Sequence, residues 1–319
     1  MTFLEAHKDE IFKKYNKEEL IQDINSYKTG NGKLQKVLNH FFEECIFNSC
    51  GKKTVISPMD VLKSEQLTEK AFNYIKTKPK FFTGTDIQNI KSFFRNSASW
   101  VRKVANFPPK EARNIYFRYN DINGNIINIL DTSMGFGSRM SAVLLSGHNY
   151  CGFDPNRDLF EKLKQYLKFL RDNELIKKEQ KCGLYCCGSE LYKPELNNKF
   201  DVSFTSPPYF NLEKYSDDTC ESTKNYDNYE LWVNNFVIPT VKNTYKYLKI
   251  GGHAMINIKN ISSKECCFDS FYKAFLNISG FEFVEIFDLQ IESKKQYGMA
   301  NGKGNITPKE PIMVFKKIS

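Results

Sequence analysis

The chain has 319 residues, of which 41% are hydrophobic and 26% are charged, and its formal net charge is +9. This composition is typical of a globular protein with a full core and excludes a largely disordered chain. No apolar run approaches the roughly 20 residues that a membrane-spanning helix needs, and the first ten residues contain no hydrophobic signal core. We therefore expect a cytoplasmic or nucleoid-associated protein that is not secreted and has no membrane partner.

The basic charge is concentrated in the first part of the chain. Residues 1–125 carry 21 basic and 14 acidic side chains, whereas residues 126–319 carry 25 and 23. Such a bias suits a polyanionic partner such as nucleic acid, although a solvated charged surface has the same composition.

The cysteines do not form the pattern of a disulfide framework. There are nine of them, an odd number, and two pairs are adjacent in sequence, Cys186-Cys187 and Cys266-Cys267. Their spacing also lacks the second pair of ligands that a zinc site needs. We expect reduced thiols and no metal site.

Residues 1–105 are predicted to form a basic helical region that is a candidate for DNA contact. Apolar residues recur at helical spacing from Leu34 to Phe42, and further helices are expected over 59–76 and 86–104. Between those two helices, the residues from Lys76 to Phe82 form a basic, aromatic turn with a proline. Contact with a phosphate backbone and a loop closed by a hydrophobic plug both fit this turn.

Residues 106–319 show a different pattern, in which short apolar runs alternate with helices. After a helix over 109–119 and a turn-rich joint at 121–125, strands are expected at 126–131, 150–154, 184–187, 201–205, 254–258, 281–289 and 311–317. Helices are expected after the first strand and over 157–171, 229–248 and 265–278. This alternation predicts an α/β fold with a doubly wound, mostly parallel sheet. Such a sheet binds ligands beyond the carboxyl ends of its strands.

Two features follow the first two predicted strands. Asp131-Thr132-Ser133-Met134-Gly135-Phe136-Gly137-Ser138 is a glycine-rich turn before a helix, where a ligand can approach backbone N–H groups. Asp154 ends the next strand, a position typical of an acid that accepts hydrogen bonds from ribose hydroxyls. An ordinary tight turn and a helix cap remain the alternatives for these two features.

Two more features follow the third and fourth strands. Glu190, in Gly188-Ser189-Glu190, would meet an adenine amino group or cap a helix. The segment Thr205-Ser206-Pro207-Pro208-Tyr209-Phe210 is stiff, because proline can neither continue a strand nor start an ordinary helix here. It presents a hydroxyl, a carbonyl and an aromatic ring in a fixed order. The clustering of all four features at one edge of a sheet predicts a ligand site with reacting groups.

At these residues the chain resembles the amino-directed DNA methyltransferases, which modify cytosine N4 or adenine N6 and share a [DNS]-P-P-[YFW] motif. The resemblance covers about residues 106–319 and implies a seven-stranded, Rossmann-like methyltransferase sheet with S-adenosylmethionine (AdoMet) as the cofactor. It also includes the turn 248–252 before the fifth strand and the closing strand, 308–315. By resemblance, the cofactor-binding residues are Phe107, Asp131, Ser133, Gly135, Gly137 and Asp154, and the catalytic residues are Ser206, Pro207, Pro208 and Tyr209.

The chain departs from the family pattern in three places. The family loop usually reads D-P-F-x-G-x-G, whereas Thr132 and Ser133 stand here. Ser189 occupies a position where an acid is frequent, which makes Glu190 the predicted adenine contact. No separate target-recognition domain follows, so residues 1–105, 211–228 and 292–310 are the candidates for target recognition. The predicted nucleic-acid contacts are Phe210, Lys294, Lys295 and Lys303.

The motif implies a mechanism in which Ser206 Oγ and the Pro207 carbonyl oxygen accept hydrogen bonds from the two N–H groups of a base amine, while Tyr209 stacks on the base. The target base must then be flipped out or single-stranded. Serine at the first motif position favours cytosine N4 over adenine N6 in DNA. The alternatives are an RNA or protein N-methyltransferase, or a nucleic-acid-binding protein with a degenerate methyltransferase core. The oligomeric state stays open.

Overall fold

The computed structural model describes residues 1–51, 56–96, 100–101, 103–119, 125–210, 226, 228–260, 262, 265–289 and 310–319. The chain divides into two compact units. One comprises Met1–Asn106, Asn156–Leu175 and Asn211–Glu221, and the other comprises Phe107–Pro155, Ile176–Phe210 and Ser222–Ser319. The predicted division at residues 105 and 106 stays a prediction.

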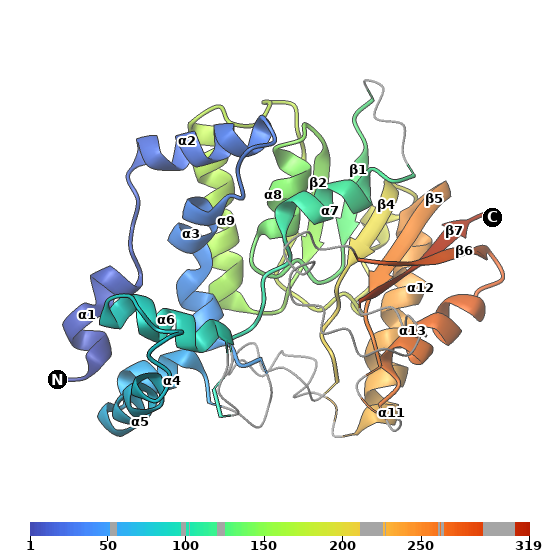
Figure 1. Cartoon of the computed structure of the whole chain (residues 1–319). Helices are drawn as coiled ribbons and strands as arrows, with labels where there is room; N and C mark the ends of the chain where they lie inside the picture. The colour runs from blue at the N-terminus through green and yellow to red at the C-terminus, as the bar shows by residue number, and fades with distance from the viewer. Residues whose placement is uncertain are drawn as a thin grey trace. The chain divides into compact units, whose positions relative to one another are not determined.

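The first unit is helical. Its helices are α1 (Phe3–Ile11), α2 (Lys17–Lys28), α3 (Gln35–Asn48), α4 (Pro58–Lys63), α5 (Glu65–Lys76), α6 (Asp86–Asn96) and α9 (Arg157–Asp172) (Figure 1). Helix α9 comes from the second half of the sequence and joins this unit because Tyr166 packs on Phe41 and Phe42 of α3, with ring centroids 5.1 and 5.7 Å apart. The predicted helix 86–104 is shorter than expected, because Val101 pairs with Ile56 in an isolated bridge.

Capping boxes fix the start of three of these helices. In α1, α2 and α4 a threonine, asparagine or serine side chain accepts from the third backbone N–H, and the acid at that position bonds back to the cap. The core of α1, α4, α5 and α6 is built on large apolar side chains, among them Phe47, Phe93 and Phe94.

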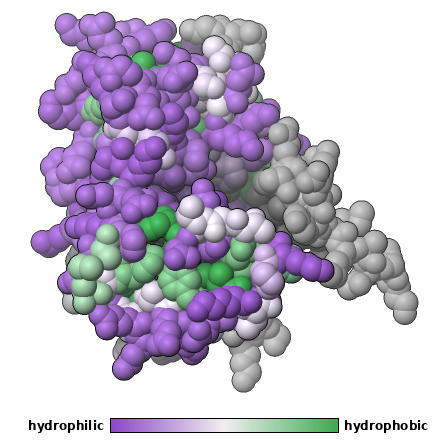
Figure 2. Space-filling model, turned by 60° about the vertical axis from the view of Figure 1, so that its left-hand side comes forward, coloured by the Kyte–Doolittle hydropathy of each residue, from purple (hydrophilic) through white to green (hydrophobic). Residues whose placement is uncertain are grey.

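On the face drawn in Figure 2, apolar residues gather in the lower part of the molecule with hydrophilic residues around them.

The second unit is built on a seven-stranded sheet. Its strands are β1 (Asn128–Asp131), β2 (Asn149–Phe153), β3 (Cys182–Tyr185), β4 (Phe200–Thr205), β5 (Leu248–Asn257), β6 (Phe281–Asp288) and β7 (Pro311–Lys317). The order in the sheet is β3-β2-β1-β4-β5-β7-β6. Strands β1 to β5 are parallel, and β7 runs antiparallel between β5 and β6. This confirms the predicted α/β, doubly wound and mostly parallel sheet.

Helices of the second unit cover the sheet. They are α7 (Pro109–Tyr116), α8 (Ser138–Leu144), α11 (Tyr229–Trp232), a π-helix (Val233–Val237), α12 (Ile238–Tyr247) and α13 (Cys267–Leu276), with a short 3-10 turn at Pro194–Leu196 (Figure 1). Side chains alternate along the strands, so the two faces have separate cores. Phe204 packs on Tyr116 of α7, whereas Phe153 stacks with Tyr247 of α12.

Two local details differ from the sequence prediction. The predicted turn at 249–252 lies inside β5 as a bulge, since Phe200 pairs with Leu248 and Val202 already pairs with His253. The predicted helix 229–248 is interrupted by the π-helix. Pro239 has no N–H to donate to the carbonyl of Asn235, and that carbonyl instead accepts from the Tyr226 hydroxyl at 3.2 Å.

Among the described residues, no helix is long and apolar enough to cross a membrane. The eight cysteines in this part of the chain are free thiols.

Candidate active site

The sheet reverses its strand order between β1 and β4. Chain connections from β1 lead toward β2 and β3, whereas β4 lies on the other side of β1 and leads toward β5. In a doubly wound sheet, the crevice beyond the carboxyl ends of two such strands is the usual ligand site. The glycine turn follows β1 and the diproline segment follows β4, so the fold brings both to this crevice.

The glycine turn is shaped by backbone geometry that favours glycine. Gly135 has φ 55° and Gly137 has φ 75°, and the Gly137 N–H donates to the Gly135 carbonyl at 2.9 Å. Gly152 on β2 allows the turn to lie close to the sheet, because a Cβ there would stand 2.8 Å from Met134 Sδ. The turn therefore holds one compact shape before α8 begins.

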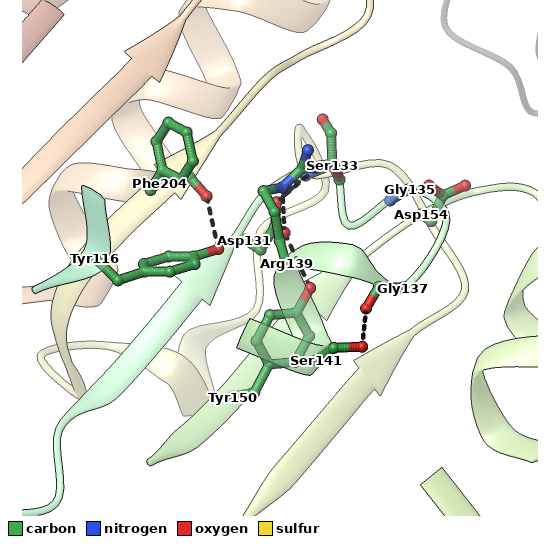
Figure 3. Close-up of polar contacts among 10 residues, drawn as sticks. All are labelled: Tyr116, Asp131, Ser133, Gly135, Gly137, Arg139, Ser141, Tyr150, Asp154 and Phe204. Atoms are coloured by element: carbon green, nitrogen blue, oxygen red, sulfur yellow. Dashed lines mark hydrogen bonds and ion pairs between the residues drawn. The ribbon is translucent and has the colours of Figure 1, made fainter. Parts of the chain in front are cut away.

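A buried ion pair supports the turn from below. Arg139 Nε donates to Asp131 Oδ2 at 2.8 Å, and the same guanidinium donates to the Ser133 carbonyl (Figure 3). Asp131 also accepts from the Tyr150 hydroxyl at 3.0 Å and from the Ser133 N–H at 3.2 Å. Burial opposes the charge on Arg139, but Asp131 outweighs it and raises the pKa of Arg139 further above its ordinary value.

This network changes the role expected for Asp131. Its side chain is fully buried and makes hydrogen bonds to three groups of the protein. It lies under the turn and fixes the position of Ser133. Asp131 is therefore a positioning residue in this structure, and its contact with the cofactor stays a prediction.

Asp154 is also tied to the turn. Its Oδ2 accepts from the Gly135 N–H at 3.2 Å, and its own N–H donates to the Tyr185 carbonyl at 3.1 Å (Figure 3). The alternative role as a helix cap belongs to Asn156, whose side chain accepts from the Leu159 N–H. Asp154 thus stands beside the turn at the end of β2, where the sequence placed it.

The Glu190 carboxylate is buried with one oxygen, Oε2, that has no hydrogen-bond partner among the described residues. It folds over Gly188, where a Cβ would meet it at 2.2 Å. Burial raises the pKa of Glu190. Such an acceptor is costly to leave unpaired, and a ligand that donates an N–H would satisfy it.

The main chain around Glu190 is anchored by α12. Asn243 Nδ2 donates to the carbonyls of Ser189 and Glu190 at 3.0 and 2.9 Å, and the Ser189 hydroxyl bonds to the Thr240 hydroxyl at 3.0 Å. Ser189 is therefore a buried structural residue. Because Ser189 is held in this way, the carboxylate that follows β3 is that of Glu190.

The diproline segment is held between β4 and the end of β5. The Tyr209 hydroxyl accepts from the Lys259 backbone N–H at 3.2 Å, which fixes the ring. Pro207 is buried, whereas Ser206, Pro208 and Tyr209 are partly exposed. Ser206 Oγ has no hydrogen-bond partner within the described part of the chain, so it is available to a substrate.

Phe107 connects the two parts of the crevice. Its ring packs edge-on against Phe204 of β4, with centroids 5.4 Å apart, and the Arg139 guanidinium lies 5.9 Å from its centroid. The segment before α7 thus reaches both the strand that carries the diproline turn and the network under the glycine turn.

Two orphan hydroxyls lie at the point where β1 and β4 end. Thr132 directly follows β1, and Thr205 is the last residue of β4; neither Oγ1 has a hydrogen-bond partner in the described residues, and both side chains are buried. The sequence pattern did not indicate that these two hydroxyls would be buried without a partner. Arg139 was also not identified from the sequence, although an arginine within the apolar helix Ser138–Leu144 indicates a buried ion pair.

One of the predicted nucleic-acid contacts lies within the described residues, and three lie outside them. Phe210 is a core residue, only 3% exposed, and packs on Tyr229 and Trp232 with centroids 5.5 and 5.9 Å away. The core around α11 and α13 covers the ring, and its contact with nucleic acid stays a prediction. Lys294, Lys295 and Lys303 lie outside the described residues. No group of three or more potential metal ligands occurs in the described ranges.

The strand order, with an antiparallel β7 between β5 and β6, is that of a doubly wound, mostly parallel sheet. No family model matches the sequence, and no curated protein matches it.

Solved structures align with this chain at low sequence identity and with TM-scores below 0.5. An rRNA methylase from Streptococcus thermophilus is 11% identical, with 68% of this chain and 99% of that chain covered and a TM-score of 0.41. A TehB-like SAM-dependent methyltransferase from Corynebacterium glutamicum is 15% identical, with 78% and 99% covered and a TM-score of 0.43. The tRNA (m1A58) methyltransferase TrmI from Aquifex aeolicus is 10% identical, with 69% and 73% covered and a TM-score of 0.39.

Proposed function

We propose that this chain is an AdoMet-dependent methyltransferase that modifies an exocyclic amine of a DNA base, with cytosine N4 favoured over adenine N6. The observation that carries the proposal is the position of Ser206-Pro207-Pro208-Tyr209. The segment follows β4, beside the strand that leads into the glycine turn, and its tyrosine is fixed by the backbone of Lys259.

The residues around the crevice fit AdoMet. We assign the ribose hydroxyls to Asp154, beside the compact glycine turn, and the adenine amine to Glu190, whose Oε2 has no hydrogen-bond partner among the described residues. The bound cofactor would supply an activated methyl group on a sulfonium.

The protein's part in the reaction is to orient the amine. A base amine is a weak nucleophile because its lone pair is delocalised into the ring. Ser206 Oγ and the Pro207 carbonyl oxygen accept hydrogen bonds from the two amine N–H groups. These bonds direct the lone pair of the amine nitrogen toward the crevice. Tyr209 stacks on the base in an orientation fixed by its bond to the Lys259 N–H. Positioning and directed acceptors thus lower the barrier.

Ser206→Ala tests this assignment. We expect AdoMet binding by calorimetry to stay within about twofold, because Ser206 makes no bond to the turn, and methyl transfer to fall about 10- to 1,000-fold, as for loss of one directed hydrogen-bonding group. Nucleoside mass spectrometry of treated DNA and RNA identifies the modified base. Full methyl transfer by the variant with AdoMet bound would refute the role of Ser206, and a product found only in RNA would favour an RNA methyltransferase.

A second function, a nucleic-acid-binding protein with a degenerate methyltransferase core, is favoured by Thr132 and Ser133, which stand where the family loop usually has proline and an aromatic residue. Calorimetry with AdoMet discriminates, because such a protein would not bind the cofactor.

A further inference from the structure

We propose that the turn between α5 and α6 is a docking surface for single-stranded nucleic acid. An unpaired base stacks on Phe81, and the lysines at 76, 78 and 80 contact the adjoining phosphates. This inference rests on the proposed function, because it gives the nucleic-acid substrate of that function a second contact.

Phe81 is displayed on the surface. Its side chain is 78% exposed, and among the large apolar side chains of the described residues only Met1 is more exposed. Phe82, by contrast, packs against the core of the helical unit. The structure therefore separates the two alternatives that the sequence left open, because Phe82 is the hydrophobic plug and Phe81 is free for contact.

The turn holds Phe81 in place. The Lys78 N–H donates to the Ile75 carbonyl, and the Phe81 N–H donates to the Lys78 carbonyl, both at 3.0 Å. The Thr77 hydroxyl donates to the Tyr74 carbonyl at 2.7 Å. Pro79 restricts the backbone further. A turn whose backbone is already ordered loses little backbone conformational entropy when a base stacks on Phe81.

Basic side chains predominate in the turn. The sequence from 70 to 85 contains four lysines and no acid, and Glu69 and Asp86 flank it. Lys76, Lys78 and Lys80 are exposed, and within the described residues none of them forms an ion pair. Lys78 Nζ lies 4.7 Å from the centroid of the Tyr74 ring and bonds to its hydroxyl at 2.7 Å. Phosphates are the groups that complement such a cluster.

A single strand satisfies both features at once. Proteins that bind single strands combine a basic track with aromatic rings on which bases stack. A duplex offers phosphates, but its base faces are already stacked and would not use Phe81. One exposed phenylalanine supplies little area for an anionic membrane, which would otherwise suit the lysines.

The experiment measures anisotropy of labelled single-stranded oligodeoxythymidine with the full chain, without AdoMet, over a range of salt. Phe81→Ala should weaken binding about 5- to 150-fold, the value of one base–aromatic stack. The triple variant K76Q/K78Q/K80Q should flatten the slope of log K against log salt by about 2, since each phosphate contact on a single strand contributes about 0.7. A matched control, K177Q/K178Q/K181Q, removes three exposed lysines elsewhere and should change affinity less than twofold.

Equal binding by wild type and both variants would overturn the proposal. So would binding of a duplex in which F81A has no effect, or F81A-sensitive binding of phosphatidylserine vesicles with oligonucleotide binding unchanged. The binding assay needs no cofactor, so it is independent of methylation. If F81A loses oligonucleotide binding and the wild-type chain methylates no base, the docking surface is supported and the proposed function is refuted.

Discussion

Replacement of Asp131 by asparagine should destabilise the sheet unit strongly. The Asp131 and Arg139 side chains are 0% and 7% exposed, with Nε 2.8 Å from Oδ2. Asparagine keeps the shape but leaves the Arg139 charge buried without a counter-charge. Breaking a buried pair in this way costs about 3–5 kcal/mol. The hydrogen bonds to Tyr150 and Ser133 fall within the same network and add to the effect.

Urea unfolding followed by tryptophan fluorescence can measure this loss. The chain has two tryptophans, and a Trp100→Phe background leaves Trp232, which is buried in the sheet unit, as the sole probe. Lys249→Gln is the control, because its pair with Asp201 is partly exposed and should be worth no more than about 1 kcal/mol. The double variant D131N/R139M should be more stable than D131N, since it removes the uncompensated charge. A loss below about 1 kcal/mol in D131N, or no recovery in the double variant, would refute the reasoning.

Three further predictions concern the crevice. Gly152→Ala should cost about 1–3 kcal/mol by overpacking, since its Cβ would stand 2.8 Å from Met134 Sδ, whereas Gly183→Ala, with its nearest neighbour at 3.6 Å, should be tolerated in the same unfolding assay. Burial raises the pKa of Glu190 above its ordinary 4.5, so the stability from its protonated form is complete below that pH and is lost as pH rises through the raised pKa. Glu190→Gln should remove that part of the pH dependence of stability, and an unchanged profile would argue against a buried carboxyl. Tyr209→Phe should lower kcat about 2- to 10-fold, the value of one hydrogen bond, with AdoMet affinity unaltered; a fall in affinity instead would place Tyr209 in the cofactor site.

The sequence was sufficient for the sheet because strand periodicity and strand-to-helix alternation are local properties. The last strand, 311–317, has the bounds that the apolar pattern predicted, and the strand before the diproline segment differs by one residue. Local patterns were less informative where a tertiary contact decides the structure. The pattern predicted helix α9 but not its partner: Tyr166 packs among the rings of α3, and amphipathic periodicity does not specify which partner covers an apolar face.

The same reasoning explains the candidate site. The order of chemical groups along the chain predicted which residues end each strand, because that order is set by sequence and topology. It did not predict which way each carboxylate turns. Asp131 turns to Arg139, eight residues ahead, whereas Glu190 keeps an oxygen unpaired because Asn243 bonds only to the main chain there. The difference arises from whether a buried donor of the protein reaches the acid. An acid paired within the fold stabilises the turn, and an acid left unpaired retains its capacity to bind a ligand. That is the physical reason why Asp131 supports the turn and why we propose Glu190 for the recognition of adenine.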